Sequence, residues 1–214
     1  MRRWATFDCY GTLIDWNDGI GRELERLFGP NDVGEKLRRY HEVEPEIQRE
    51  DPSRSYREVM AIALARLGAP AEEEDALGLS LPGWEPFPEV PAALEEARSR
   101  GWSLAILSNS DRDLIDASIA RLGVPFDATI VASEIGSYKP APGHWDEFFY
   151  RTGADRARHV HVGASLFHDI APAVSLGLRT VWINRLGETA EPQPDVELHT
   201  LDGLADSLDS LVPA

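Results

Sequence analysis

The residues of this sequence that are best suited to chemistry follow short apolar segments. Asp8 comes directly after the apolar run 4–7, and Gly11 and Thr12 follow it. The carboxyl end of a buried parallel strand is where open α/β sheets bind their ligands. A carboxylate that is held rigidly and partly dry in such a place can act as a nucleophile. Asp8 is therefore the candidate nucleophile, although an ordinary turn aspartate is the commoner interpretation of this motif alone.

Three later apolar segments also end in polar groups. In chain order these groups are Ser108 with Asn109, then Lys139, then Ser165 with Asp169. A hydroxyl and an amide beside a helix N-terminus favour the binding of an anion. A cation near Asp8 would lower the pKa of its carboxyl. Each group alone has a structural alternative as a helix cap, a solvated charge or a first-turn acid. Their occurrence at successive segment ends favours one shared site.

The segments that position these groups predict an α/β fold. Apolar runs that indicate strands alternate with amphipathic segments that indicate helices. The expected strands are 4–7, 103–107, 128–132, 159–162 and 179–183, and the expected helices are 89–100, 111–122, 143–152, 168–176 and 201–211. This alternation is typical of a Rossmann-like parallel sheet with helices on both faces. We expect the active cleft at the carboxyl ends of its strands.

A long helical region separates the first strand from the rest of the alternating pattern. Residues 16–84 predict several helices and no strand, so we expect them to form a helical cap subdomain inserted after the first strand. Residues 1–15 and 85–214 would then form the Rossmann-like catalytic core. A break or kink is expected at Pro45, because proline removes a helical hydrogen bond.

The charge of the chain bears on its partners. Its 214 residues include 21 basic and 37 acidic side chains, a formal net charge of −16. Such a charge argues against nucleic acid or an anionic membrane surface as a partner. A small anionic organic substrate would need a local group of cations or backbone N–H donors.

The remaining composition is that of an ordinary globular protein. The single cysteine, Cys9, excludes an internal disulfide and fits a reducing compartment. No basic segment leads into an apolar one and no apolar run is long enough to span a membrane, so a cytoplasmic location is expected. A homodimer through helices of the cap or the core is compatible with the sequence.

The polar motifs together resemble those of a known family. The motifs are Asp8-x-Tyr10-Gly11-Thr12, Ser108-Asn109, Lys139-Pro140 and the loop from Gly163 to Asp169. In this order they are similar to the haloacid dehalogenase superfamily, over essentially the whole chain. The resemblance implies a Rossmann-like core, a helical cap after the first strand, an aspartate nucleophile and a covalent aspartyl intermediate.

Two positions discriminate between branches of that superfamily. Phosphatases of the family have an acid two residues after the nucleophile and another directly after the glycine of the fourth loop, where it helps to bind Mg²⁺. This sequence has Tyr10 and Ala164 there. A phenol protonates an alkoxide leaving group poorly, and Ala164 supplies no oxygen ligand. A halide leaving group needs neither, so the chain resembles the L-2-haloacid dehalogenase branch, and no cofactor is expected.

The resemblance implies a role for each site residue. Asp8 would attack C2 of a short 2-haloalkanoic acid, displace the halide and form an ester, which water would then hydrolyse. The other catalytic residues would be Lys139, which holds Asp8, and Asp169, which orients or deprotonates the water; the substrate-binding residues would be Tyr10, Thr12, Arg39, Ser108, Asn109 and Ser165. Ser108 would bind the substrate carboxylate and Asn109 would face the halide.

Two parts of this assignment depend on features that depart from the family pattern or lack a fixed register. The fourth loop is one residue longer than in dehalogenases, and the asparagine expected before Asp169 has no clear counterpart. Dehalogenases of this type also use a cap arginine near the halide, for which Arg39 is the choice. The neighbouring His41 and Glu42 favour a solvated helix face over an acid–base pair.

Two other functions are compatible with these residues. The first is a Mg²⁺-dependent phosphatase acting on a small phosphomonoester, with Asp8 and Asp169 as metal ligands. The second is a non-catalytic protein that uses the fold to bind a small acid or a protein. The complete set of strand-end groups makes the second the least favoured.

Overall fold

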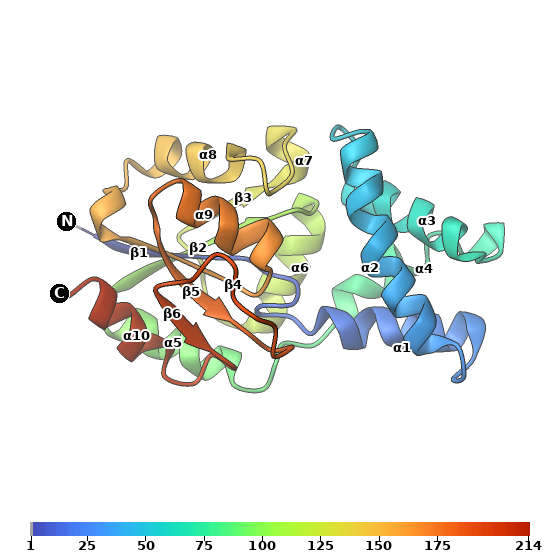
Figure 1. The fold of residues 1–214 in the computed structure, drawn as a ribbon, viewed down its shortest axis with the longest axis horizontal. Helices are drawn as coiled ribbons and strands as arrows, with labels where there is room; N and C mark the ends of the chain where they lie inside the picture. The colour runs from blue at the N-terminus through green and yellow to red at the C-terminus, as the bar shows by residue number, and fades with distance from the viewer. Residues whose placement is uncertain (1) are drawn as a thin grey trace.

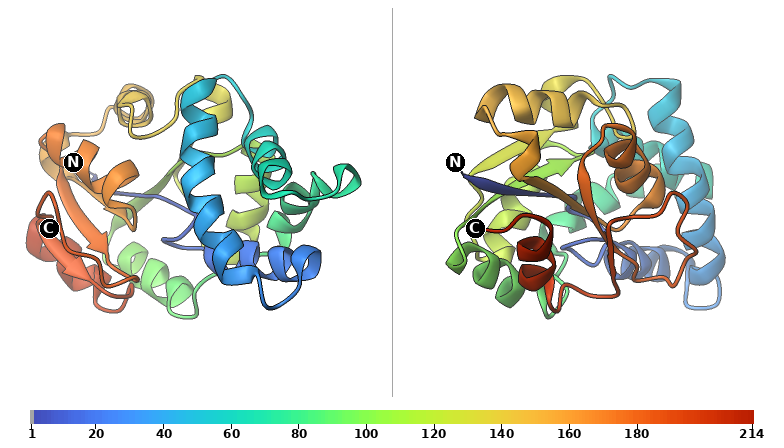
Figure 2. Two further views of the ribbon diagram at one scale, coloured as in Figure 1. Left: turned by 45° about the vertical axis from the view of Figure 1, so that its right-hand side comes forward. Right: turned by 60° about the vertical axis from the view of Figure 1, so that its left-hand side comes forward.

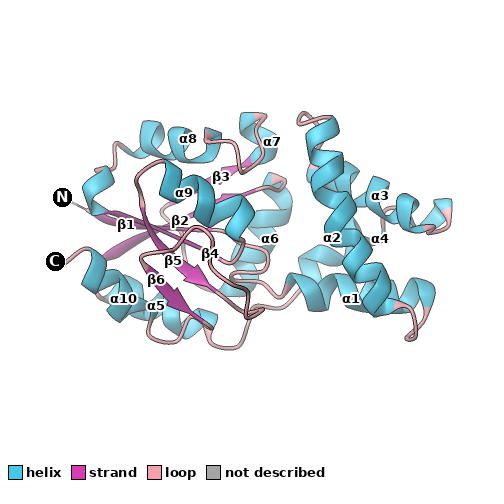
Figure 3. Ribbon diagram, in the orientation of Figure 1, coloured by secondary structure: helices cyan, strands magenta, loops and turns pink. Residues whose placement is uncertain are grey.

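The structure of the chain, a computed structural model that describes residues 2–214, is built on one parallel sheet (Figures 1 and 3). Its six strands lie in the order β3-β2-β1-β4-β5-β6, and all of them pair in parallel. The strands are β1 (Arg3–Phe7), β2 (Trp102–Ser108), β3 (Ala128–Val131), β4 (His159–Gly163), β5 (Arg179–Ile183) and β6 (Val196–Leu198). The predicted α/β fold is therefore confirmed. The short edge strand β6 was not predicted.

Helices cover both faces of the sheet. The core helices are α5 (Val90–Ser99), α6 (Arg112–Leu122), α7 (Ala132–Ile135), α8 (Gly143–Thr152), α9 (Ala171–Ser175) and α10 (Leu204–Leu211). Successive side chains of a strand point to opposite faces. Trp4 of β1 accordingly packs with Trp145 and Phe148 of α8, whereas Phe7 belongs to the core that α5, α6 and α10 complete.

The strand order places a topological switch point between β1 and β4. The chain moves from β1 to β2 and β3 on one side, and then returns to β4, β5 and β6 on the other. Ligands of open α/β sheets bind at such a point, beyond the carboxyl ends of the strands. β1 ends at Phe7 and β4 ends at Gly163, so Asp8 and the loop after Gly163 flank this position.

The helices of residues 16–84 lie beyond the carboxyl ends of the strands, on the side opposite to both chain termini (Figures 1 and 2). They are α1 (Trp16–Phe28), α2 (Val33–Glu50), α3 (Tyr56–Leu67) and α4 (Ala76–Ser80), with the 3₁₀ turns η1 (Ala71–Glu73) and η2 (Leu81–Gly83). The connections to this region run side by side, because Asp15 N donates to Glu85 O and Phe87 N donates to Leu13 O. We propose that this pair of connections delimits the cap, with residues 16–84 as the cap and residues 1–15 and 85–214 as the core.

Helix α2 does not break at Pro45, as the sequence led us to expect. It continues from Val33 to Glu50 without interruption. Proline costs the helix one backbone hydrogen bond. Tertiary packing of the helix offsets this cost, because Val43 and Ile47 on either side of the proline are fully buried.

One buried histidine of the core gives a prediction for stability. His144 of α8 is fully buried, and its Nε2 lies 2.9 Å from Ser108 O. Burial lowers the pKa of His144 to about 3. The unfolded chain therefore takes up a proton on this side chain below pH 6.5 while the folded chain does not, so its contribution to stability is lost as the pH falls.

We expect the substitution His144→Gln to reduce the pH dependence of stability. The difference in unfolding free energy between wild type and variant should change by about 2 kcal/mol between pH 7 and pH 5, in favour of the variant at the lower pH. Urea denaturation of both proteins at the two pH values measures it. A difference that is the same at both pH values would show that His144 titrates alike in the folded and unfolded chains.

Candidate active site

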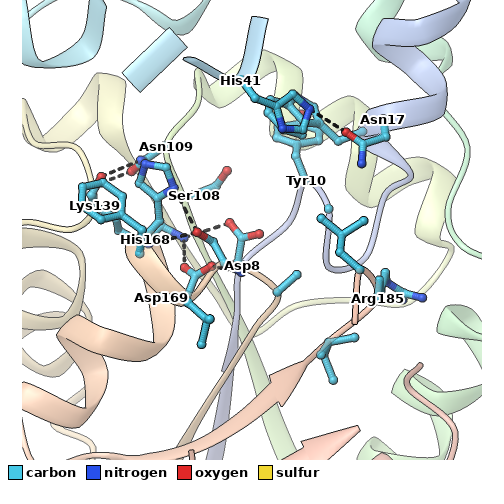
Figure 4. Close-up of a pocket in the computed structure, with 18 of the residues that line it drawn as sticks. Asp8, Tyr10, Asn17, His41, Ser108, Asn109, Lys139, His168, Asp169 and Arg185 are labelled. Atoms are coloured by element: carbon cyan, nitrogen blue, oxygen red, sulfur yellow. Dashed lines mark hydrogen bonds and ion pairs between the residues drawn. The ribbon is translucent and has the colours of Figure 1, made fainter. Parts of the chain in front are cut away.

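Two carboxylates share one lysine at the switch point (Figure 4). Lys139 Nζ lies 2.8 Å from Asp8 Oδ1 and 2.7 Å from Asp169 Oδ1, and it also donates to Leu107 O at 2.8 Å. All three N–H groups of the ammonium therefore have acceptors. The side chains of Lys139 and Asp169 are 1% exposed, whereas that of Asp8 is 13% exposed. All three line the pocket, and Asp8 is the most exposed of them.

Burial and charge act in opposite directions on these groups. Burial raises the pKa of Asp8 to about 6, and the Lys139 charge opposes it. Burial would also raise the pKa of Asp169, but Lys139 and His161 outweigh it and hold that pKa well below its usual range. The expected effect of Lys139 on Asp8 is thus correct in direction, but desolvation is larger. Asp169 is a permanent anion and a weak base.

Thr12 fixes the second oxygen of the candidate nucleophile. Its Oγ1 donates to Asp8 Oδ2 at 2.9 Å and accepts from Ala164 N at 2.9 Å. Gly11 has φ of 89°, a conformation that favours glycine, and this turn brings Thr12 back to Asp8. Thr12 is fully buried and does not line the pocket. The structure therefore gives Thr12 a positioning role, in place of the substrate contact expected from the sequence.

The fourth loop contains a π-helix, η4 (Leu166–Ile170). Such single π-helical turns are rare and are frequently found at functional sites. This turn holds Asp169 in contact with the Lys139 ammonium. The α-helix expected over 168–176 is therefore replaced by the π-helix followed by the shorter α9. A side chain at Gly163 would lie 2.5 Å from Asp169 Cβ, so this approach requires glycine.

Ser165 begins this turn, and its contacts differ from direct substrate binding. Ser165 Oγ accepts from His168 N at 3.0 Å and lies 3.2 Å from His168 Nδ1. Ser165 N donates to Asp169 Oδ2 at 3.3 Å. Ser165 and His168 both line the pocket. The sequence analysis did not select His168 as a site residue, because the π-turn that aims it at the pocket has no sequence signature of its own.

The end of β2 contributes Ser108 and Asn109 to the pocket. Asn109 Oδ1 accepts from Lys139 N at 2.6 Å, and Asn109 Nδ2 donates to Lys139 O at 2.9 Å. One N–H of the amide thus has no partner in this pair of bonds and can face a ligand. Asn109 therefore positions the backbone of Lys139 as well as lining the pocket. Ser108 is buried beside it.

A pocket of about 560 Å³ opens above these groups, between the core and α2. Tyr10 forms part of its wall and stacks with Tyr56 at 6.3 Å between ring centroids. Its hydroxyl lies 3.1 Å from Ser118 Oγ, which itself donates to Leu114 O, so Tyr10 is the donor in the first bond. Burial raises the pKa of the Tyr10 phenol well above its usual value. Tyr10 is therefore an aromatic wall residue and a poor proton donor for a leaving group.

Arg39 does not reach this pocket. Its side chain is 54% exposed and forms an ion pair with Glu42, away from the lining residues. His41, which is close to it in the sequence, does line the pocket, and its Nε2 lies 2.9 Å from Asn17 Oδ1. Glu42 is exposed to solvent, as expected. His41 is not on the solvated face, because it lies on the side of α2 that lines the pocket.

Four further ionisable residues line the pocket that were not predicted from the sequence, namely Asp15, Glu44, Arg185 and Glu188. Glu44 lies one turn after His41 on α2, and Arg185 follows the end of β5. Arg185 donates to Thr12 O and Glu89 Oε1, at 2.9 and 2.7 Å. The signal for Arg185 was its position after a strand, as for the other groups. Glu44 could have been found as a carboxylate among the apolar residues that recur along the buried side of this helix, such as Val43 and Ile47.

A Mg²⁺ ion does not fit the donor set of this centre. Mg²⁺ requires several free oxygen ligands in near-octahedral geometry. Asp8 and Asp169 each direct one oxygen to the Lys139 ammonium and the other to Thr12 or Ser165. The position after Gly163 is Ala164, which has no donor. Within residues 2–214, no group of three or more His, Cys, Asp or Glu side chains has the arrangement of a metal site.

Comparison with known proteins relates this geometry to a family. Residues 3–177 match the haloacid dehalogenase-like hydrolases. An (S)-2-haloacid dehalogenase of Pseudomonas sp. (strain YL) is 30% identical over 208 residues, 91% of this chain and 89% of that protein. A solved L-2-haloacid dehalogenase is 25% identical, with 97% of this chain and 99% of that one covered and a TM-score of 0.86.

A phosphatase also matches, over a shorter segment. The glyceraldehyde 3-phosphate phosphatase of Methanothermobacter thermautotrophicus is 31% identical over 120 residues, 55% of this chain and 52% of that protein.

Fold and site together define a hydrolase that works at the switch point of a parallel sheet. The chain belongs to the haloacid dehalogenase-like hydrolase family, as its motifs predicted, and is an enzyme similar to (S)-2-haloacid dehalogenases. Among the helices of residues 2–214, none combines the length and apolar character needed to cross a bilayer.

Proposed function

We propose that the protein cleaves the carbon–halogen bond of a short 2-haloalkanoic acid through a covalent ester on Asp8, without a metal ion. The observation that carries this proposal is the arrangement around Lys139. Both carboxylates that share this ammonium line the pocket, but the Asp8 side chain is 13% exposed and that of Asp169 only 1%. A desolvated, fixed carboxylate next to a substrate is suited to nucleophilic attack.

In the first step the Asp8 carboxylate attacks C2 of the substrate in line, and the halide leaves with the bonding electrons. The negative charge of Asp8 is lost as the ester forms, and the halide carries it away. Ser108 and the unpaired N–H of Asn109 line the pocket at the end of β2 and would hold the substrate carboxylate or the halide. This anionic substrate is the partner that we propose for the pocket.

In the second step water attacks the ester carbonyl carbon of Asp8 and releases the hydroxy acid. Asp169 holds Lys139 and Ser165 N, so it orients this part of the pocket. Because its pKa is held low, it is a poor acceptor for the proton of the water. Burial lowers the pKa of the neighbouring His168 to about 4, which leaves it neutral at pH 7 and the stronger base beside Ser165.

The relatives support this reaction over phosphate transfer. The (S)-2-haloacid dehalogenase matches 91% of this chain, against 55% for the phosphatase. The Tyr10 hydroxyl donates a hydrogen bond to Ser118 Oγ, so it does not replace the acid that an alkoxide leaving group needs. The occupied oxygens of Asp8 and Asp169 likewise argue against a metal-dependent reaction at this centre.

The proposal is tested by halide release from short 2-haloacids in the presence of EDTA. We expect (S)-2-chloropropionate to release chloride at the same rate with EDTA and with added Mg²⁺, and p-nitrophenyl phosphate to release no phosphate. An ion-selective electrode and a phosphate assay measure the two products. Phosphate release that requires Mg²⁺, with no halide release, would contradict the proposal and favour the phosphatase.

A further inference from the structure

Glu44 of α2 is a buried carboxyl group without a cation partner. It is 6% exposed and lines the pocket, and its Oε1 accepts from Gln48 Nε2 at 2.6 Å. No Lys or Arg among residues 2–214 forms an ion pair with it. An unpaired carboxylate is costly to bury, so such a group favours its neutral, protonated form. A protonated carboxyl has one O–H to donate.

The position of Glu44 relates it to the leaving group of the proposed reaction. In an in-line displacement, the leaving group departs on the side of C2 opposite to the nucleophile. Asp8 lies at the strand ends of the core, and α2 lies beyond those ends (Figure 1). Between them is the pocket, which His41, Glu44 and Pro45 line from the side of α2. A halide that leaves C2 on the side opposite to Asp8 therefore moves toward the part of the pocket that α2 lines.

We propose that Glu44, in its protonated form, donates a hydrogen bond to the halide as it leaves C2, and that this bond enables the enzyme to release fluoride. The inference rests on the proposed dehalogenase function. The proton is shared with the halide and stays on Glu44, so the C2–halogen bond breaks, the bond from C2 to Asp8 forms, and the halide leaves as an anion. Glu44 thereby takes the place that Arg39 was expected to occupy.

The benefit of this bond depends on the halide. Fluoride is the poorest leaving group of the halides and the strongest hydrogen-bond acceptor, so a donor in the transition state matters most for it. Bromide leaves readily and accepts hydrogen bonds weakly. A fixed hydrogen-bond donor to the charge that develops in a transition state contributes about 10²-fold or more to the rate. The contribution of Glu44 should therefore rise from bromide to fluoride.

The pH dependence of the reaction follows from the groups around Glu44. The titratable groups that face it are Asp8 at the end of β1, Tyr40 and His41 on its own helix, Tyr56 on α3, and Tyr138 in the loop before Lys139. Burial raises the pKa of Glu44 to about 7, and the Asp8 charge adds to this rise. The phenols stay neutral, because burial raises the pKa of each of them above its usual value.

Fluoride release should therefore have a bell-shaped pH profile. The rate rises as Asp8 ionises, through about pH 6, and falls as Glu44 loses its proton, through about pH 7. The carboxyl groups of Asp8 and Glu44 interact, so the two pKa values of the profile describe the titration of the pair and not of each residue separately. The substitution Glu44→Gln keeps the shape and an N–H donor but does not titrate. We expect it to remove the falling limb and retain fluoride release.

The test compares fluoroacetate and bromoacetate as substrates for the wild type and for the variants Glu44→Gln and Glu44→Leu. In Glu44→Leu, which has no donor, fluoride release should fall about 100-fold and bromide release about tenfold or less. Glu42→Gln, which removes an exposed acid from the same helix, is the matched control and should change neither rate.

Two results would overturn the inference. Equal loss of fluoride and bromide release in Glu44→Leu would show a structural effect without selectivity for the leaving group. A falling limb that persists in Glu44→Gln would show that another group causes it. Either result leaves the proposed function intact as long as the wild type releases bromide. A wild type that releases no halide from any 2-haloacid would refute the proposed function, and this inference with it.

Discussion

The substitution Asp8→Asn is expected to lower halide release by about 10⁴-fold or more, because loss of a catalytic nucleophile has effects of this size. The amide has no negative charge with which to attack C2. Asn is nearly the same shape, and its oxygen can still accept from Lys139 Nζ, so the fold should be retained. Halide release at pH 7 with EDTA, together with circular dichroism of the variant, measures both expectations.

A control and a label make this experiment specific to a covalent ester. Glu188→Gln changes another carboxyl of the pocket wall and should leave most of the activity. In a single turnover of the wild type in heavy-oxygen water, the label should appear in Asp8 and be absent from the first product. Label in the product of that first turnover would indicate that water attacks the substrate directly, in which case Asp8 is no nucleophile.

The substitution Lys139→Met should abolish activity and also destabilise the fold. Removing the ammonium leaves Asp8 and Asp169 with their buried charges uncompensated, and Leu107 O loses its donor. Breaking a buried ion pair by deleting one partner costs about 3–5 kcal/mol. We expect a loss of unfolding free energy of that size at pH 7, measured by urea denaturation.

The sign of the pH dependence checks the cause of this loss. Without the cation, the pKa values of Asp8 and Asp169 should rise, so protonation at lower pH relieves the repulsion. The deficit of Lys139→Met should therefore shrink between pH 7 and pH 5. The variant Lys36→Met, at the only other lysine of the chain, is the control, and we expect about 1 kcal/mol or less from it. A deficit that is independent of pH would point to lost packing of the lysine stem.

The sequence by itself was sufficient for the fold class and for the centre of the site. Asp8, Lys139 and Asp169 each follow an apolar segment, and the carboxyl ends of parallel strands meet at one edge of a sheet. Strand ends are local features, visible as a change from apolar to polar residues. The connectivity then brings them together, so a one-dimensional pattern predicted a three-dimensional cluster.

Which side chains of α2 line the pocket was decided by the tertiary structure alone. Arg39 and Glu44 lie five residues apart on one helix, yet Arg39 is exposed and Glu44 is buried. The direction of a helical side chain depends on how the whole helix packs, because helices present residues all around their axis. Tertiary packing also determines the π-turn that directs His168 to the pocket. It likewise determines how far burial raises the pKa of Asp8 against the effect of the Lys139 charge. Desolvation depends on every element that covers a group, and no local pattern of residues contains that information.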